Sequence, residues 1–123
     1  MNDFDLYFKM MKNSSNEDDF MAVLSTLPCL NMLLKLMDRK AKAKKPFSSE
    51  FNYQEKLTQL LKAEEILHLA LDKNEFRNDE VINNLNLISN IAIQASEEIK
   101  LISLKNDYLY LASIFKDSAI FLS

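Results

Sequence analysis

The side chains best suited to acid–base, metal or phosphoryl chemistry are Glu64, Glu65 and His68. Glu65 and His68 have the Glu-x-x-His spacing that di-iron four-helix bundles use on facing helices. Such a centre needs a second pair of this kind, and His68 is the single histidine of the chain. We therefore expect no metal site and no cofactor.

His68 admits two further interpretations. A small acidic helical bundle can present one reactive imidazole for phosphoryl transfer, but Leu69 and Ala70 follow His68 where such domains typically have lysine and glycine. On a helix, Glu64 falls within the apolar stripe and His68 lies at its edge, one turn later. Because a carboxylate that enters a core needs a partner, we favour a structural polar pair of Glu64 and His68. A histidine phosphotransfer bundle is the less favoured alternative.

Catalysis by other residues has little support in the sequence. The chain contains no glycine, and phosphate-binding loops and nucleophile elbows depend on glycine for their backbone conformations. Neither Arg39 nor Arg77 stands shortly before His68, as an arginine does in helical-bundle ribonucleases. We expect that the protein is not an enzyme.

The basic segment 35–45 is the second candidate site. It carries six cations and Asp38, a net charge of +5, in a chain whose net charge is −3. On a helix, Lys35, Arg39 and Lys42 project together from the side opposite the apolar stripe. The segment is either a solvated helix end, whose cations complement the helix dipole, or a docking patch for an acidic protein or a phosphate backbone. Lys45 would extend a patch for nucleic acid, which is the weaker alternative for an acidic chain.

The last segment, 107–122, is apolar on two sides of a helix. One stripe contains Tyr108, Leu111, Ala112, Phe115, Ala119 and Leu122. A second stripe, about 140° around the helix, contains Tyr110, Ile114 and Phe121. Such a helix either lies at the centre of a bundle or offers its second stripe to a twin subunit or another protein. Tyr110, Ile114 and Phe121 are therefore candidate partner-binding residues, together with Lys35, Arg39 and Lys42.

The elements that position these residues are all helices. Apolar side chains recur at helical spacing throughout the chain, and 48% of the residues are hydrophobic, enough for the core of one domain. The pattern predicts a single all-α domain over residues 1–123, an antiparallel bundle of four main helices plus a short N-terminal helix over residues 4–11.

The ends of the expected helices follow from caps and breakers. Pro28 predicts a kink in the first main helix, which ends at Pro46. Ser48 or Ser49 is expected to cap the second main helix, and Asn78 or Asp79 the third. The third, from Asn78 past Ile102, is expected to span about 26 residues, with a turn at Asn106-Asp107 before the last helix.

The composition also indicates a cellular location. Cys29 is the single cysteine, so no internal disulfide can form, which is typical of a reducing compartment. Asp3 and Asp5 stand where a secretory signal would be basic, and we expect no apolar run of the length that a membrane span needs. The excess of lysine over arginine is typical of an AT-rich genome, such as that of a low-GC bacterium or phage. We expect a cytoplasmic protein with no membrane partner.

These observations favour a small protein-binding module that acts stoichiometrically. An inhibitor, an immunity or anti-defence factor, a secretion chaperone and a subunit of a complex all fit this description. The partner is expected to be another protein or a second copy of the chain. The alternative from another class is a nucleic-acid-associated accessory protein that uses the basic segment 35–45.

Overall fold

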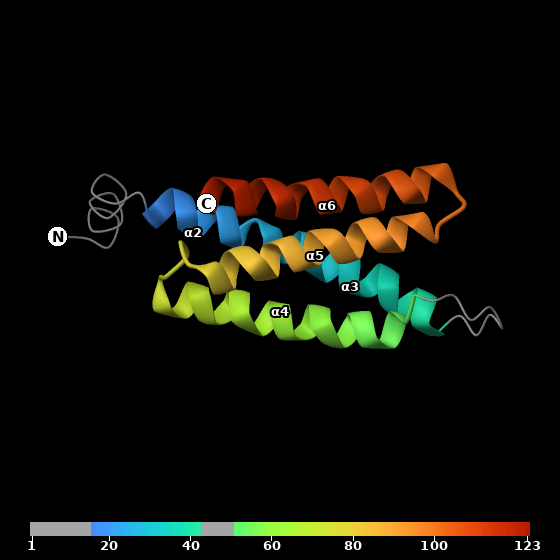
Figure 1. The fold of residues 1–123 in the computed structure, drawn as a ribbon, viewed down its shortest axis with the longest axis horizontal. Helices are drawn as coiled ribbons and strands as arrows, with labels where there is room; N and C mark the ends of the chain where they lie inside the picture. Colours follow the sequence, from blue (N-terminus) through green and yellow to red (C-terminus); the bar gives the residue numbers. More distant parts are fainter. Residues whose placement is uncertain (1–15, 43–50) are drawn as a thin grey trace, which may run out of the picture.

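A computed structural model describes residues 16–42 and 51–123, of which 87% are helical and none forms a strand. The helices are α2 (Asn16–Leu24), α3 (Thr26–Lys42), α4 (Tyr53–Lys73), α5 (Asp79–Glu97) and α6 (Ile102–Leu122). Figure 1 shows α4, α5 and α6 running antiparallel, with α2 and α3 forming one interrupted helix behind them. The expected all-α bundle of four main helices is confirmed. The short helix expected over residues 4–11 lies outside the described residues.

The core lies at the centre of the ring that these helices form. α5 packs against α4 on one side and α6 on the other, and α3 closes the ring by contacting both α4 and α6. Each helix buries one apolar stripe, and the largest fully buried side chains are Leu30, Leu33, Met37, Leu60, Leu67, Phe76, Leu85, Ile88, Ile91, Tyr108, Phe115 and Leu122. The four main helices therefore share one core, as the periodicity of the sequence predicts.

The closest helix pair is α5 with α6. Both helices bury alanines in the core, Ala92 and Ala95 on α5 and Ala112 and Ala119 on α6. Such small side chains allow two helix backbones to approach closely. The buried hydroxyl of Ser89 donates a hydrogen bond to the Ala112 carbonyl at 2.8 Å. This bond joins the two helices at a point where both residues are buried.

The interruption between α2 and α3 lies at Ser25, three residues before Pro28. A proline has no N–H and cannot complete the helical ladder, so a break in the preceding turn is expected. Three hydroxyls donate to carbonyls beside the break, and the first, of Ser25, bonds the Ala22 carbonyl at 3.2 Å. Thr26 bonds the carbonyl three residues before it at 2.6 Å, and Ser118 of α6 bonds the Ala22 carbonyl at 3.0 Å. The break is thereby tied to α6.

Asparagines set three of the helix ends. The Asn52 side chain accepts from the Glu55 N–H at 3.1 Å and caps α4, while Ser48 and Ser49, the residues expected there, lie outside the described residues. Asn78 caps α5 as expected, accepting from the Val81 N–H at 2.9 Å. Asn74 ends α4 with a left-handed backbone, φ 56°. Asparagine tolerates this conformation better than most residues, so it replaces glycine here.

The turn between α5 and α6 differs from its expected place. α5 ends at Glu97, after 19 residues, and α6 already begins at Ile102, so the expectation of a helix of about 26 residues is wrong. Ile99 is buried in the turn, whereas Ile102 is 72% exposed. Asn106 and Asp107 mark the solvent side of α6 and not a turn. Because Leu101 precedes α6 without a side-chain cap, no residue type marked this helix start in the sequence.

The interrupted helix Glu17–Lys42 is long and apolar enough to cross a membrane, judged by length and composition alone. Its most apolar window has a mean hydropathy of 1.6, and 28% of that window is buried inside the protein. The expectation that no segment has these properties is therefore wrong. The same helix contributes Val23, Leu30 and Leu33 to the core of the bundle.

Candidate binding surfaces

The outer side of α6 is exposed, so α6 is not a central helix. Its inner stripe, from Tyr108 to Leu122, is buried as the sequence predicts. Of the second stripe, Tyr110 is 69% exposed, Phe121 is 46% exposed and Ile114 is half-buried. The structure therefore keeps these three side chains outside the core.

More apolar side chains belong to this side of α6 than the sequence analysis singled out. Ile102, Leu109 and Ile120 are also exposed, and helical spacing places them about 100° around the helix from the second stripe, beyond a row of polar residues. We call this set the outer α6 face, and its members are Ile102, Leu109, Tyr110, Ile114, Ile120 and Phe121. The polar residues Asn106 and Ser113 interrupt the face, which is why no single apolar period revealed it.

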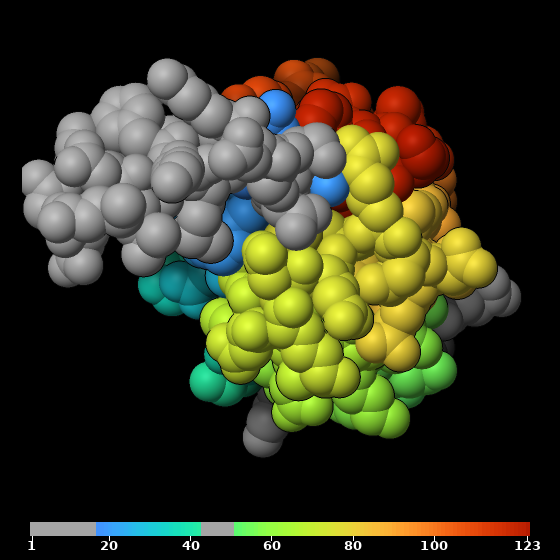
Figure 2. Space-filling view, turned by 90° about the vertical axis from the view of Figure 1, so that its left-hand side faces the viewer, coloured from blue at the N-terminus to red at the C-terminus, as the bar shows by residue number. Residues whose placement is uncertain are grey.

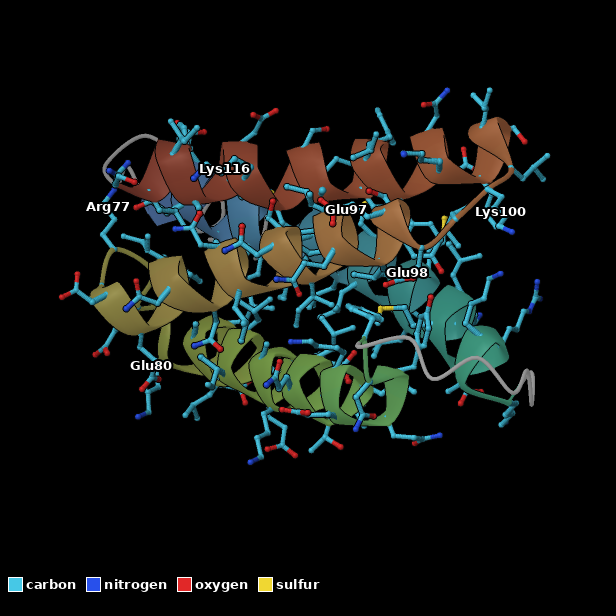
Figure 3. All side chains as sticks on the ribbon, turned by 45° about the vertical axis from the view of Figure 1, so that its right-hand side comes forward. Arg77, Glu80, Glu97, Glu98, Lys100 and Lys116 are labelled. Carbon is cyan, nitrogen blue, oxygen red and sulfur yellow. The ribbon has the colours of Figure 1, made fainter. Side chains whose placement is uncertain are left out.

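One end of the outer α6 face meets an ion pair that the sequence analysis did not anticipate. Arg77, in the turn before α5, donates two hydrogen bonds to the Asp19 carboxylate of α2, at 2.9 and 3.0 Å. The Arg77 guanidinium also lies 5.5 Å from the centre of the Phe121 ring. Figure 2 shows this end of the bundle, where α2, the α4–α5 turn and the end of α6 meet. Figure 3 shows Arg77 reaching from the turn toward the end of α6.

The charges of this ion pair have different surroundings. Asp19 is buried and Arg77 is about half exposed. The hydrogen bonds to Asp19 raise the pKa of Arg77, against a smaller opposite effect of desolvation. A bidentate contact of this geometry is among the stronger charge-assisted hydrogen bonds. The pair therefore fixes the α4–α5 turn against α2 and orients Phe121 at the edge of the outer α6 face.

The cations of the basic segment are exposed on α3. Lys35, Arg39 and Lys42 point into solvent, and Lys42 pairs with Asp38 of the preceding turn at 2.9 Å. Lys35 and Arg39 form no ion pair with any described residue. Lys45 lies outside the described residues. The structure thus keeps the three cations together on one side of the helix, as their spacing predicts.

Glu64 and His68 do not form the expected buried pair. His68 is exposed and Glu64 is only half-buried, and no hydrogen bond or ion pair links them within residues 16–42 and 51–123. The buried stripe of α4 runs instead through Leu60, Ala63, Leu67 and Ala70, which turns His68 outward. The physical reason is that Glu64 reaches solvent and needs no partner. No three metal-binding side chains gather in the described part of the chain.

The opposite end of the bundle holds a buried tyrosine, Tyr108. The Tyr108 hydroxyl contacts no donor or acceptor among the described residues, and burial, followed by the nearby Tyr53 hydroxyl, raises the pKa of Tyr108 to about 12. Burial and the Glu98 carboxylate likewise raise the pKa of Tyr53. Figure 3 places Glu98 at the end of α5, far from Arg77. These phenols stay neutral at physiological pH and carry no charge toward a ligand.

Comparison with known proteins adds no functional information. No protein-family model, no curated protein and no solved structure matches this chain.

Proposed function

We propose that the protein is a small cytoplasmic protein-binding module that acts stoichiometrically and uses the outer α6 face as its binding surface. One observation carries this proposal: the bundle buries a complete core while leaving Tyr110, Ile120 and Phe121 exposed together on one helix. Clustered apolar side chains on a soluble protein are typical of interaction sites. An inhibitor, an immunity or anti-defence factor, a secretion chaperone or a subunit of a complex would each use such a face.

The composition of the outer α6 face supports a protein partner. Aromatic side chains with polar neighbours are enriched at protein interfaces, where they supply much of the binding energy. Tyr110 offers a ring and a hydroxyl, and Lys116 and Asp117 provide charges beside the apolar residues. A second copy of the chain is one partner that this surface would accept. We expect no catalytic role.

The test is a variant that removes apolar surface without touching the core. Tyr110→Ser with Ile120→Ser changes two side chains that are mostly exposed, so the bundle should stay folded by circular dichroism. Leu69→Ser on α4 and Ile93→Ser on α5 remove apolar side chains that are 45% and 40% exposed elsewhere on the bundle, and form the control. The measurements are sedimentation velocity for self-association and quantitative capture of partners from host extract.

The two variants separate the outcomes. If the outer α6 face binds a partner, the Tyr110/Ile120 variant becomes monomeric or loses the captured protein by more than tenfold, since two hot-spot truncations cost on the order of 2 kcal/mol or more. The control variant keeps the partner. Equal binding by both variants would contradict the proposal.

A nucleic-acid-associated role is the second candidate, because Lys35 and Arg39 are exposed and not paired within the described residues. The outward side of α3 carries no aromatic side chain that would stack on bases, and the chain is acidic, with a net charge of −3. If phosphate contacts dominate, binding to DNA or RNA should fall steeply between low and physiological salt. A gel-shift titration at two salt concentrations decides this candidate.

A further inference from the structure

The outward side of the interrupted helix α2–α3 forms one stripe with two chemically different halves. Its seven members follow one another at spacings of three or four residues and all are exposed: Met21, Leu24, Pro28, Met32, Lys35, Arg39 and Lys42. We call them the α2–α3 stripe. The first four are apolar, with Met21 48% and Met32 55% exposed, and the last three are cations.

The apolar half is not explained by the core. α2 and α3 pack into the bundle through the other side, where Val23, Leu30 and Leu33 are fully buried. A surface helix of a soluble protein normally carries polar residues opposite such a stripe. Here the most apolar window of Glu17–Lys42 has the composition of a membrane-spanning helix, yet only 28% of it is buried in the protein. The exposed apolar side chains of this helix, at Met21, Leu24, Pro28 and Met32, are therefore left for another environment.

The cationic half of the α2–α3 stripe determines how the molecule would be oriented at a charged surface. Segment 35–45 has a net charge of +5 in a chain of net charge −3, so the remaining residues carry −8. This separation orients the α3 end of the molecule toward an anionic surface and its other parts away from it. Asp38 is the acidic residue beside the stripe at this end, and Lys42 pairs with it. Glu17 and Asp18 stand at the other end, before the apolar half begins.

We propose that the α2–α3 stripe docks the protein onto the surface of an anionic lipid bilayer. Met21, Leu24 and Met32 enter the boundary between headgroups and acyl chains, and the cations bind lipid phosphates, the two contributions that hold amphipathic helices at membranes. The helix lies on the bilayer and does not span it, because its inner side belongs to the core. The Asp19–Arg77 ion pair holds α2 in the bundle. This docking does not depend on the outer α6 face, which belongs to another helix.

Nucleic acid is a poorer match for the whole stripe. It would use the three cations and leave the methionines and Leu24 without a partner, and the stripe has no aromatic side chain for base stacking. A bilayer surface, in contrast, matches both halves at once. The apolar half and the charge arrangement together therefore favour lipid.

A tryptophan at position 32 reports directly on insertion, since the chain contains no tryptophan. We expect the emission of Met32→Trp to shift to the blue with vesicles of phosphatidylcholine and phosphatidylglycerol, and to be quenched by brominated lipid. Phosphatidylcholine vesicles alone should leave it unchanged. Leu69→Trp on α4, a similarly exposed position, is the matched control and should not respond. The same response from both reporters would overturn the proposed orientation.

Charge removal tests the second half of the stripe. The triple variant Lys35→Gln, Arg39→Gln and Lys42→Gln should weaken vesicle co-sedimentation on the order of 100-fold. Each cation near an anionic surface strengthens binding by about fivefold, and the three factors multiply. Lys62→Gln with Lys73→Gln and Lys100→Gln removes the same charge from other exposed positions and should retain most of the binding. An equal loss in both triple variants, or no binding of the unmodified protein to anionic vesicles, would overturn the proposal. Salt-sensitive binding to DNA in the absence of vesicle binding would assign the cations to nucleic acid instead.

Discussion

Asp19 and Arg77 are 58 residues apart in the chain and are joined by two hydrogen bonds of 2.9 and 3.0 Å. The Asp19 carboxylate is buried and the Arg77 guanidinium is half-exposed, so Arg77 supplies the counter-charge for a carboxylate inside the bundle. Arg77 also covers the Phe121 ring. Three segments that are distant in sequence therefore meet through one side chain.

The two partners should not be equivalent on mutation. Asp19→Asn keeps the shape of the site and should lower the free energy of unfolding by about 1–3 kcal/mol, because hydrogen bonds to charged groups are worth this much. Arg77→Ala should destabilise more than Asp19→Asn does, since it leaves a buried carboxylate without a partner. Urea denaturation measures both.

The double variant and an exposed arginine complete this test. Combining Arg77→Ala with Asp19→Asn should recover part of the loss, as no buried charge then remains. Arg39→Ala, which removes an arginine without an ion pair to a described residue, should have no measurable effect on unfolding. If Arg77→Ala behaved like Arg39→Ala, the ion pair would not form in solution.

Removing the Tyr108 hydroxyl, by Tyr108→Phe, should not destabilise the protein. Tyr108→Phe removes a buried group that has no partner in the described part of the chain, so it should leave stability unchanged or raise it by up to about 1–2 kcal/mol. A loss of 2 kcal/mol or more would mean that the hydroxyl has a partner. Thermal and urea unfolding give the comparison, with the exposed Tyr110→Phe as the control.

Tyr108 also predicts a dependence of stability on alkaline pH. Its folded pKa, about 12, lies above the ordinary tyrosine value of 10.0, because burial disfavours the charged form. The stability contribution is constant below pH 10, where the phenol is neutral in both states. It is lost as the pH rises from 10 toward 12, because the unfolded state releases its proton first. Tyr108→Phe should flatten this decline, which denaturant titrations combined with tyrosinate absorbance would record.

The hydrogen bond between α5 and α6 predicts a moderate loss. Ser89→Ala should cost about 1 kcal/mol, because the Ala112 carbonyl has its helical partner and loses only the added bond. Ser89→Leu should cost more, about 1–3 kcal/mol from overpacking between two close helices. Ser103→Ala, at an exposed position of α6, is the control. Equal stability of Ser89→Leu and the unmodified protein would show that the helices are not closely packed.

His68→Gln should change neither folding nor partner binding. The imidazole is exposed and unpaired within the described residues, and surface substitutions of this kind stay within about 0.5 kcal/mol. Thermal unfolding and the capture assay check the two properties. A folded His68→Gln variant that loses its biological activity would favour histidine phosphotransfer.

Local signals in the sequence, such as apolar spacing and helix caps, predicted the bundle well. The sequence carried no signal for contacts between residues that are far apart in the chain. The apolar spacing of the third main helix, predicted from Val81 to Ile102, and the Asn78 cap are local features; the structure contains the cap and buries the stripe as far as Ile99, but exposes Ile102. The start of α6 was missed because Leu101 provides no side-chain cap, and two polar residues on its solvent side looked like a turn. Sequence spacing placed Tyr110 and Phe121 on a second stripe but did not establish that it faces outward.

The Asp19–Arg77 ion pair could not be predicted from the sequence. Asp19 stands in a polar run and Arg77 in a turn, and nothing in either neighbourhood indicates the other residue. Their contact depends on how α2 and the α4–α5 turn are placed by the common core. The expected Glu64–His68 pair failed for the opposite reason: local spacing was satisfied, but the rotation of α4 in the bundle left both groups access to solvent.

The two serines that bond across helices, Ser89 and Ser118, both donate to main-chain carbonyls. The acceptors at Ala112 and Ala22 are therefore supplied by the backbone whatever residue occupies those positions. In related sequences, the donor positions should retain serine or threonine, while the acceptor positions should vary freely within the limit of a small volume. In a saturation-mutagenesis survey of folding, position 89 should therefore accept only small side chains with a hydroxyl, whereas position 112 should accept small side chains with or without one.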